Sequence, residues 1–539
     1  MNPASSSKPA LVGLILAVSM TTIDQTIVAL SAPTIQQNLG LSHDGMQWAV
    51  NVYLLTTAAF FLLGGRVADV VGHKRLALVG IAGFGITSLL CGLTPSGDLA
   101  EAWLVGARAL QGVSGAIMFP AAIGIVVEGF PRERRGRAMA IFFTITGAMT
   151  AVGPIAGGYL TQWTWRSIFW VNVPIAVVSF VIVALTARPS TRRRERIDWL
   201  GAAVVAAGMA ALVFGLQQAS PWGWGNPAVL ASLIGGAVLL VLFGRLQLRT
   251  AQPLVQLRAF RDRGVLFSRL ATLFASIAFM SAFFFLSVWG QVSLQLTAME
   301  TGILFLKFFI GFVIGSRIGS VRFDRQGAKA MVLLGGVVGA AGFVWLALGA
   351  TDLGVDGSIF FNAQTAPLVL AGAGIGLMFT PVSTDAVNRA AGATYGEASA
   401  LTQTMKNFGG ALGIAVFSTI VTSRLTDLLT ASFAKFGGSA ANAQDAVNQI
   451  SGASDRSSAL STLPHVVQEQ ILHAVRSDYA SAVQWAFWGM AAAMAVVAVI
   501  GLLYPAGRTS LPEGDERVQA GASTETAATD ASGAENATV

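Results

Sequence analysis

Cysteine and charge are both scarce in this sequence. Of its 539 residues, 11% are charged and 54% are hydrophobic, whereas a soluble domain carries roughly 25% charged residues. A chain with so few charges cannot cover a water-facing surface, so the composition indicates a polytopic membrane protein. The single cysteine, Cys91, lies in an apolar run and excludes both a disulfide framework and a thiolate metal site.

Sequence motifs for catalysis and for nucleotide or metal binding are also missing. The chain has no G-x-x-x-x-G-K-[ST] phosphate loop and no nucleophile elbow. Its four histidines form no metal-binding pair on one helix face in a predicted span. We therefore expect no enzyme, no cofactor and no metal. The formal charge of +7 comes from Lys and Arg clustered between apolar runs, which indicates membrane topology and no nucleic-acid partner.

Apolar segments long enough to cross a membrane recur along the chain. A span needs about 20 mostly apolar residues. We expect a long polar loop at 424–479, with an amphipathic helix near Val466–Val475, and a disordered tail at 505–539. Fourteen spans are predicted, at 10–31, 46–65, 76–95, 100–128, 137–161, 166–187, 199–219, 228–248, 264–290, 300–321, 329–350, 366–388, 398–423 and 480–504.

The distribution of Lys and Arg predicts the orientation. If the N-terminus is cytoplasmic, 25 of the 34 basic residues lie on that side and five lie outside. By the positive-inside rule this predicts an N-in, C-in multi-pass protein of the cytoplasmic (inner) membrane. We expect it to contact membrane lipids and to be a monomer.

A short motif occurs twice in predicted turns. "GGRVADVVGHKR" (64–75) follows the second span, "GSVRFDRQGAK" (319–329) follows the tenth, and both contain D-x-x-G-x-K. Internal repeats of this kind are typical of secondary transporters. They predict a cytoplasmic N-terminus (1–9), a six-helix bundle (10–187), a basic linker (188–198), two additional helices (199–248), a second basic linker (249–263), a second six-helix bundle including the extracellular loop 424–479 (264–504), and a cytoplasmic tail (505–539).

Further motifs resemble those of the fourteen-helix drug–proton antiporter branch of the major facilitator superfamily. "VGARALQGVSGA" (105–116) resembles its fourth-helix motif, "GAMTAVGPIAGG" (147–158) its fifth-helix antiporter motif, and "IDQTIVALSAP" (23–33) its first-helix motif. The resemblance covers roughly residues 10–423 and the last span. It implies an all-α major facilitator fold and an exporter of amphipathic small molecules that works by alternating access and is driven by the proton gradient.

The sequence leaves other functions to be distinguished from this one. An exporter of the same fold dedicated to one endogenous metabolite, lipid or antibiotic stays open. A membrane-embedded enzyme lacks catalytic groups, and a membrane sensor would carry a large soluble output domain, so both are less favoured.

Asp24 and Arg108 are predicted to lie at one depth on facing helices. At 1.5 Å per residue, both fall about 10 Å below the outer face. Pairing with Arg108 favours the charged carboxylate of Asp24, whereas desolvation favours its neutral form. We therefore hypothesise that Asp24 is the main group that binds and releases the transported proton, and that Arg108 adjusts its proton affinity. A purely structural ion pair is the alternative. Secondary proton-path candidates are Glu128, Glu300 and Asp385.

Two glycine-containing motifs are assigned mechanical roles. Pro154 is expected to kink the fifth span, and the resemblance implies that the glycines around it pack on the other half; ordinary small-residue packing is the alternative. In the first turn motif, Asp69 is expected to meet the start of a span near 396–399, and Lys74 and Arg75 to meet acids or lipid phosphates. A merely solvated turn is the alternative. The kink set is Gly147, Gly153, Pro154, Gly157 and Gly158, and the latch set is Gly65, Asp69, Gly72, Lys74, Arg75 and Asp324.

The second half contains two intramembrane lysines and no deep acid. Lys307 is expected to pair with Glu300, to meet Asp24 or a substrate anion, or to snorkel; Arg269 is expected to snorkel. The lysines make neutral, zwitterionic, lipidic or anionic substrates more plausible than purely dicationic drugs. Substrate-cavity candidates are Gln25, Phe119, Trp289, Phe305, Lys307, Phe379 and Lys406, with packing or lipid contact as the alternative for each aromatic residue.

Overall fold

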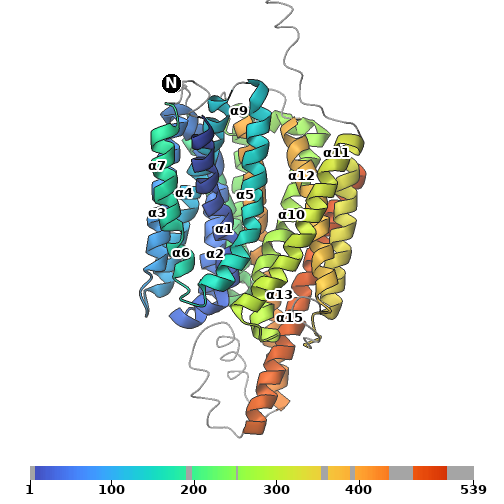
Figure 1. Ribbon diagram of the computed structural model, residues 1–539. Helices are drawn as coiled ribbons and strands as arrows, with labels where there is room; N and C mark the ends of the chain where they lie inside the picture. The colour runs from blue at the N-terminus through green and yellow to red at the C-terminus, as the bar shows by residue number, and fades with distance from the viewer. Residues whose placement is uncertain are drawn as a thin grey trace, which may run out of the picture.

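The computed structural model describes residues 7–130, 132–189, 197–250, 253–255, 257–353, 362–388, 395–435 and 465–506. Over these residues every regular element is a helix and no strand occurs, which confirms the predicted all-α fold (Figure 1). Thirteen helical segments of the described chain are long and apolar enough to cross a membrane. They correspond in order to thirteen of the predicted spans, and the predicted fifth span lies in the 29-residue helix α5.

The helices follow the predicted order along the chain. In the first half they are α1 (Ser7–Leu39), α2 (His43–Val71), α3 (His73–Gly92), α4 (Ala100–Gly129), α5 (Arg132–Leu160), α6 (Ser167–Trp170) and α7 (Asn172–Thr186). Two further helices follow, α8 (Trp199–Trp222) and α9 (Pro227–Arg249). The second half contains η1 (Leu257–Arg261), α10 (Arg263–Val288), η2 (Trp289–Ser293), α11 (Ala298–Gly349), α12 (Thr365–Asn388), α13 (Tyr395–Lys435) and α15 (His465–Leu503).

Polar side chains define where several helices begin. Ser42 accepts a hydrogen bond from the Gly45 amide at the start of α2, and Asp262 accepts from two amides at the start of α10. At the start of α11, Thr297 and Glu300 form a capping box. Each cap satisfies amides that have no partner within the helix, which matters most where water is excluded.

The two repeated turn motifs have one backbone feature in common. Gly72 ends α2 with φ 105°, and Gly327 interrupts α11 with φ 73°. Only glycine adopts such angles without steric cost. The two glycines occupy the same place in D-x-x-G-x-K, and the break at Gly327 divides α11 into the two predicted spans.

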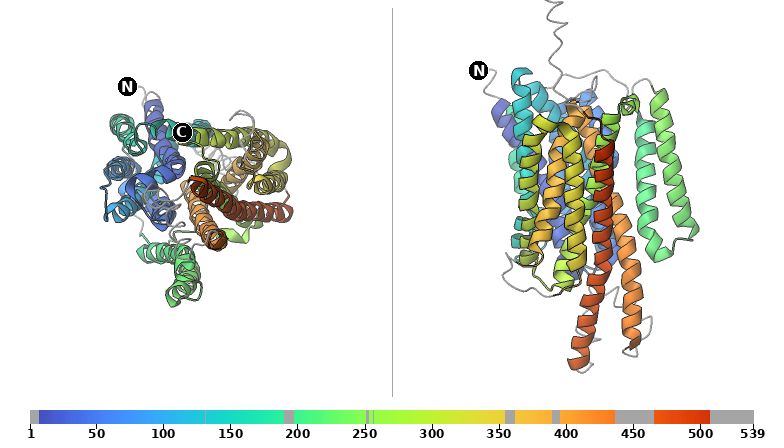
Figure 2. Two further views of the ribbon diagram at one scale, coloured as in Figure 1. Left: turned by 90° about the horizontal axis from the view of Figure 1, so that it is seen from below. Right: turned by 90° about the vertical axis from the view of Figure 1, so that its right-hand side faces the viewer.

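The two halves pack against each other along several helices. Contacts between them join α2 to α13, α5 to α11, and α1 to α10. The helices α8 and α9 form a hairpin at the side of the other helices (Figure 2). Because α8 contacts both α2 and α13, this hairpin lies against both halves.

The predicted loop 424–479 is wrong at both ends. Helix α13 continues to Lys435 instead of ending at 423, and α15 begins at His465 instead of 480. The predicted amphipathic helix therefore belongs to the first turns of α15. Apolar length indicates where a membrane ends, whereas a helix satisfies its own backbone and can continue into water. Residues 436–464 and 507–539 lie outside the described residues.

Candidate functional site

Asp24 on α1 and Arg108 on α4 form an ion pair in the interior of the first half. Their exposed fractions are 0% and 1%. Arg108 also donates from Nη1 to Gln111 Oε1 (2.6 Å) and from Nε to the Ala49 carbonyl oxygen (3.1 Å), and Gln111 Nε2 donates to Asp24 Oδ1 (3.0 Å). Both oxygens of the Asp24 carboxylate therefore have donors. The structure thus brings together the two residues that were predicted to share one depth.

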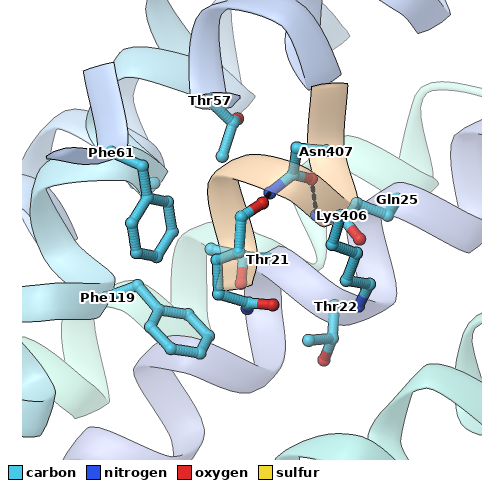
Figure 3. Close-up of a pocket in the computed structure, with 10 residues that line it drawn as sticks. Thr21, Thr22, Gln25, Thr57, Phe61, Phe119, Lys406 and Asn407 are labelled. Atoms are coloured by element: carbon cyan, nitrogen blue, oxygen red, sulfur yellow. Dashed lines mark hydrogen bonds between the residues drawn. The ribbon is translucent and has the colours of Figure 1, made fainter. Parts of the chain in front are cut away.

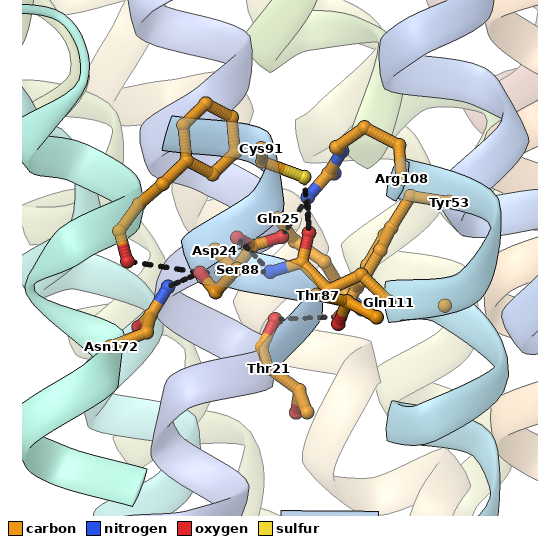
Figure 4. Close-up of polar contacts among 12 residues, drawn as sticks. Thr21, Asp24, Gln25, Tyr53, Thr87, Ser88, Cys91, Arg108, Gln111 and Asn172 are labelled. Carbon is orange, nitrogen blue, oxygen red and sulfur yellow. Dashed lines mark hydrogen bonds and ion pairs between the residues drawn. The ribbon is translucent and has the colours of Figure 1, made fainter. Parts of the chain in front are cut away.

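Further residues surround this pair (Figure 4). The Tyr53 ring on α2 lies 4.2 Å from the Arg108 guanidinium carbon, measured to the ring centroid. Gln111 Nε2 also lies 3.3 Å from Ser88 Oγ on α3, which in turn accepts from Asn172 Nδ2 of α7 at 3.0 Å. The network thus connects five helices of the first half. Gln111 was not predicted as a site residue, although it lies three residues after Arg108 and hence on the same helix face.

A pocket lies between the two halves, next to the Asp24 network. Its space is about 290 Å³, including its open mouth. At its boundary Gln25 Nε2 of α1 donates to Asn407 Oδ1 of α13 at 3.2 Å. Its lining residues are Thr21, Thr22, Gln25, Thr57, Phe61, Gly115, Phe119, Gln403, Lys406 and Asn407 (Figure 3).

Three of the predicted cavity residues line this pocket: Gln25, Phe119 and Lys406. Phe61, which was not among the predicted cavity residues, lies beside Phe119 with ring centroids 5.4 Å apart. Phe61 lies on α2 and Phe119 on α4, so this aromatic wall belongs to the first half.

The other predicted aromatic residues lie outside the described pocket lining. Trp289 donates from its indole nitrogen to the Ala350 carbonyl oxygen (3.1 Å), and Phe305 stacks on Phe283 (5.5 Å between centroids). Phe379 packs beside Phe279, with its ring centroid 5.7 Å from the Lys406 ammonium nitrogen. In helices that are apolar on all sides, sequence gives the depth of a residue but not the direction it faces.

Lys307 and Glu300 do not pair, which excludes one of the alternatives predicted for Lys307. Lys307 Nζ donates to Asn362 Oδ1 (2.8 Å), and Glu300 accepts from the amide and hydroxyl of Thr297 (2.8 and 2.9 Å). Glu300 is therefore engaged in the helix cap. Lys307 is buried and lies outside the described lining of the pocket, and Asn362, which it reaches, lies in the turn before α12. Lys307 therefore does not meet Asp24, which pairs with Arg108.

The glycines of the α5 motif pack in two directions. A Cβ added at Gly153 would lie 2.9 Å from the Ile23 carbonyl oxygen of α1, and one at Gly157 would lie 2.8 Å from Ile27. At Gly158 the nearest atom would be Met299 Cα of α11, also at 2.9 Å. The motif thus contacts the other half through Gly158, while Gly153 and Gly157 serve the packing of its own half. Pro154 lies inside the continuous helix, and an added Cβ at Gly147 would meet no atom within 4 Å.

Asp69 of the latch motif contacts a histidine in the described structure. His73 Nε2 lies 3.2 Å from Asp69 Oδ1, and His73 Nδ1 lies 3.3 Å from Glu128 Oε1 on α4. Glu128 therefore contacts the first turn motif through His73 and is not among the residues that line the pocket. The side chains of Asp324 and of residues 396–399, the predicted partner of Asp69, lie outside the described residues.

Lys74 donates from Nζ to the carbonyl oxygens of Ala184 and Ala187 (2.8 and 2.7 Å). These carbonyls end α7, where a cation is favourable. Arg75 is exposed, and Gly65 lies beside Pro120, which an added Cβ would approach to 3.7 Å.

Two ionisable residues of the second half are buried near the end of the bundle that carries the N-terminus. Asp385 on α12 accepts a hydrogen bond from the Tyr504 hydroxyl at 2.6 Å. Arg269 on α10 is 3% exposed and donates to Thr402 of α13. The expectation that Arg269 snorkels is wrong, because helix α13 supplies a polar partner inside the bundle.

Comparison with known proteins gives one consistent family. The sequence model described as "Major Facilitator Superfamily" matches residues 14–414. The chain is 34% identical to the cephamycin export protein CmcT of Amycolatopsis lactamdurans, over 78% of this chain and 86% of that protein. It is 34% identical to the puromycin resistance protein pur8 of Streptomyces alboniger, over 76% and 81% of the two chains.

Solved structures agree on the fold. A bacterial homologue of the human lysosomal transporter Spinster, in an inward-facing and unoccupied conformation, matches with a TM-score of 0.58 and 14% identity, over 93% of this chain and 97% of that one. The xylose transporter XylE from E. coli, in a partially occluded inward-open conformation, matches with a TM-score of 0.57 and 11% identity, over 93% and 100%.

Proposed function

The chain belongs to the Major Facilitator Superfamily, and we propose that it exports amphipathic small molecules across the cell membrane in exchange for protons. It is a multi-pass membrane protein and a transporter, not an enzyme. In this proposal it works as a monomer in lipid, with both termini in the cytoplasm. The proton gradient drives transport without a cofactor.

One observation carries the proposal: a buried, paired carboxylate lies next to a pocket between the halves. Asp24 pairs with Arg108, while the adjacent Gln25 on the same helix hydrogen-bonds to Asn407 of the second half. Protonation of Asp24 removes the charge that holds Arg108. Release of Arg108 from Asp24 therefore changes how α1 and α4 pack against each other beside the pocket. Proton binding and rearrangement of the halves can be coupled through this one segment of α1.

Contacts between the halves oppose opening at the end away from the N-terminus. The Leu30 carbonyl oxygen on α1 accepts from Ser287 Oγ (2.7 Å) and Gln291 Nε2 (2.9 Å) of the second half. The close approach of Gly158 to Met299 joins α5 to α11 nearby. In alternating access these contacts break when the pocket opens to the outside.

A dedicated exporter is the second candidate, supported by the names of the relatives. One relative is a cephamycin export protein and another a tetracenomycin C resistance and export protein, whereas a third, from Bacillus subtilis, is multidrug resistance protein 3. Uptake of a panel of dyes and antibiotics into inverted vesicles with an imposed pH gradient separates the two. Accumulation of several unrelated compounds favours the multidrug function, and accumulation of one compound favours the dedicated one.

The Asp24→Asn variant tests proton coupling. We expect it to fold and reach the membrane, but to lose pH-gradient-driven uptake into inverted vesicles, because the amide cannot exchange a proton. The matched control is Asp98→Asn, which removes a carboxylate from an exposed turn and should leave uptake unchanged. Gradient-driven uptake by Asp24→Asn at the wild-type rate would contradict the proposed role.

A further inference from the structure

Lys406 carries a charge for which the described residues provide no counter-ion. Asp24 and Arg108 neutralise each other, whereas the Lys406 ammonium makes no hydrogen bond or ion pair with any described residue. The Lys406 ammonium nitrogen lies 5.7 Å from the centroid of the Phe379 ring, within the range of a cation–π contact. Lys406 is only 9% exposed, and it lines the pocket. A buried charge without a partner costs several kcal/mol, so an anion bound in this pocket would be strongly favoured.

The groups around Lys406 suit a small polar head group. Gln25 Oε1 is buried without a hydrogen-bond partner and can accept from a ligand. The hydroxyls of Thr21 and Thr22 donate to carbonyl oxygens of their own helix at 2.7 and 3.0 Å, which leaves their oxygens free to accept. Figure 3 shows Lys406, Gln25 and Thr22 on one side of the pocket.

The opposite side of the pocket is apolar. Phe61 and Phe119 pack on each other there, with ring centroids 5.4 Å apart and an interplanar angle of 56° (Figure 3), and together they form an apolar wall for the adjoining part of a ligand. No carboxylate is among its lining residues, so a cationic group would meet only the like charge of Lys406.

We propose that this pocket binds the anionic group, best a carboxylate, of an amphipathic organic anion. Lys406 supplies the counter-charge, and Phe61 and Phe119 contact the adjoining apolar or aromatic part. The inference rests on the proposed export function and narrows its substrate class. The Lys406 ammonium is a compact charge with rotatable donors, so it can pair with a carboxylate without a fixed planar arrangement.

A matched pair of fluorescent probes tests this inference on the full-length protein. Dansyl-phenylalanine carries a free carboxylate, and its methyl ester is neutral but otherwise nearly identical. We expect the purified wild type to bind the carboxylate about tenfold more tightly than the ester, because a charge-assisted contact contributes about 1.5 kcal/mol or more. Lys406→Gln should abolish that preference while changing ester affinity less than about twofold, and Lys406→Arg should retain most of it.

Lys307→Gln is the control, since it removes a second intramembrane lysine that lies outside the described pocket lining. It should preserve the preference for the carboxylate. Equal binding of the two probes by the wild type, or a full preference in Lys406→Gln, would overturn the inference even if gradient-driven export of other compounds is intact. Loss of gradient-driven uptake for every compound of the panel would instead overturn the proposed function. A Lys406→Gln protein that does not fold leaves the decision to Lys406→Arg and the wild-type probe ratio.

Discussion

Asp24 and Lys406 differ in how their buried charges are compensated. The Asp24 carboxylate receives donors from Arg108 and Gln111, and Arg108 reaches the Ala49 carbonyl oxygen. Lys406, in the neighbouring pocket, has no such partner among the described residues. A compensated charge belongs to the resting structure, whereas an uncompensated one in a cavity is suited to a ligand.

Removal of one partner of the ion pair is expected to cost more stability than removal of both. Arg108→Gln leaves the Asp24 carboxylate buried without its cation, which should cost about 3–5 kcal/mol. The double variant with Asp24→Asn has no buried charge left at this site, so it should recover at least half of that loss. Thermal unfolding of the detergent-solubilised protein measures this difference. A double variant as unstable as Arg108→Gln would show that the two side chains are not energetically coupled.

Single residues also show what could be predicted from the sequence and what could not. The depth of Asp24 and Arg108 follows from counting residues along straight helices, and the structure brings them together. The direction of Trp289 and Phe305 was not predictable, because helices of this kind are apolar on every side. The role of Glu300 was predictable but missed: Thr297-x-x-Glu300 has the spacing of a capping box.

For whole elements, the turns were easier to predict than the helix ends. Two D-x-x-G-x-K motifs predicted equivalent turns, and both glycines have positive φ. The ends of α13 and α15 could not be read from hydropathy, because these helices continue through polar residues beyond the predicted spans. The location of an apolar span and the length of a helix are separate quantities.

Helix α5 provides a comparison within one motif. An added methyl group at Gly153 would collide with Thr26 and approach the Ile23 carbonyl oxygen of α1, whereas at Gly147 it would meet no atom within 4 Å. We therefore expect Gly153→Ala to lower the thermal unfolding midpoint, by an amount equivalent to roughly 1–3 kcal/mol. Gly147→Ala should be neutral or slightly stabilising, since alanine is the better helix former.

Thermal unfolding of the two purified variants against the wild type measures the effect. Equal midpoints for Gly153→Ala and Gly147→Ala would contradict the close packing of α5 on α1. The motif would then act only through its contact with α11.

The arrangement of the whole molecule places α8 at a junction of the two halves. Helix α8 contacts α2 of the first half and α13 of the second, and Thr419 Oγ1 on α13 donates to the Leu216 carbonyl oxygen of α8 at 2.6 Å. Movement of the halves must therefore either carry this hairpin with one of them or break its contact with the other. The sequence predicted two additional helices, but their position depends on three-dimensional contacts that hydropathy does not encode.

A cross-link between the halves tests whether transport requires their separation at the end away from the N-terminus. The single native cysteine, Cys91, is buried, so cysteines can be introduced at Leu30 and Gln291, whose backbone and side chain are in contact across the halves. A short bifunctional thiol reagent should join them and reduce gradient-driven uptake by at least about tenfold, because the closed contact can no longer open. Each single-cysteine variant, treated in the same way, should retain its uptake. Undiminished uptake by the fully cross-linked protein would mean that substrate passes without separation of α1 from α10 and η2, and that the halves open along a different set of contacts.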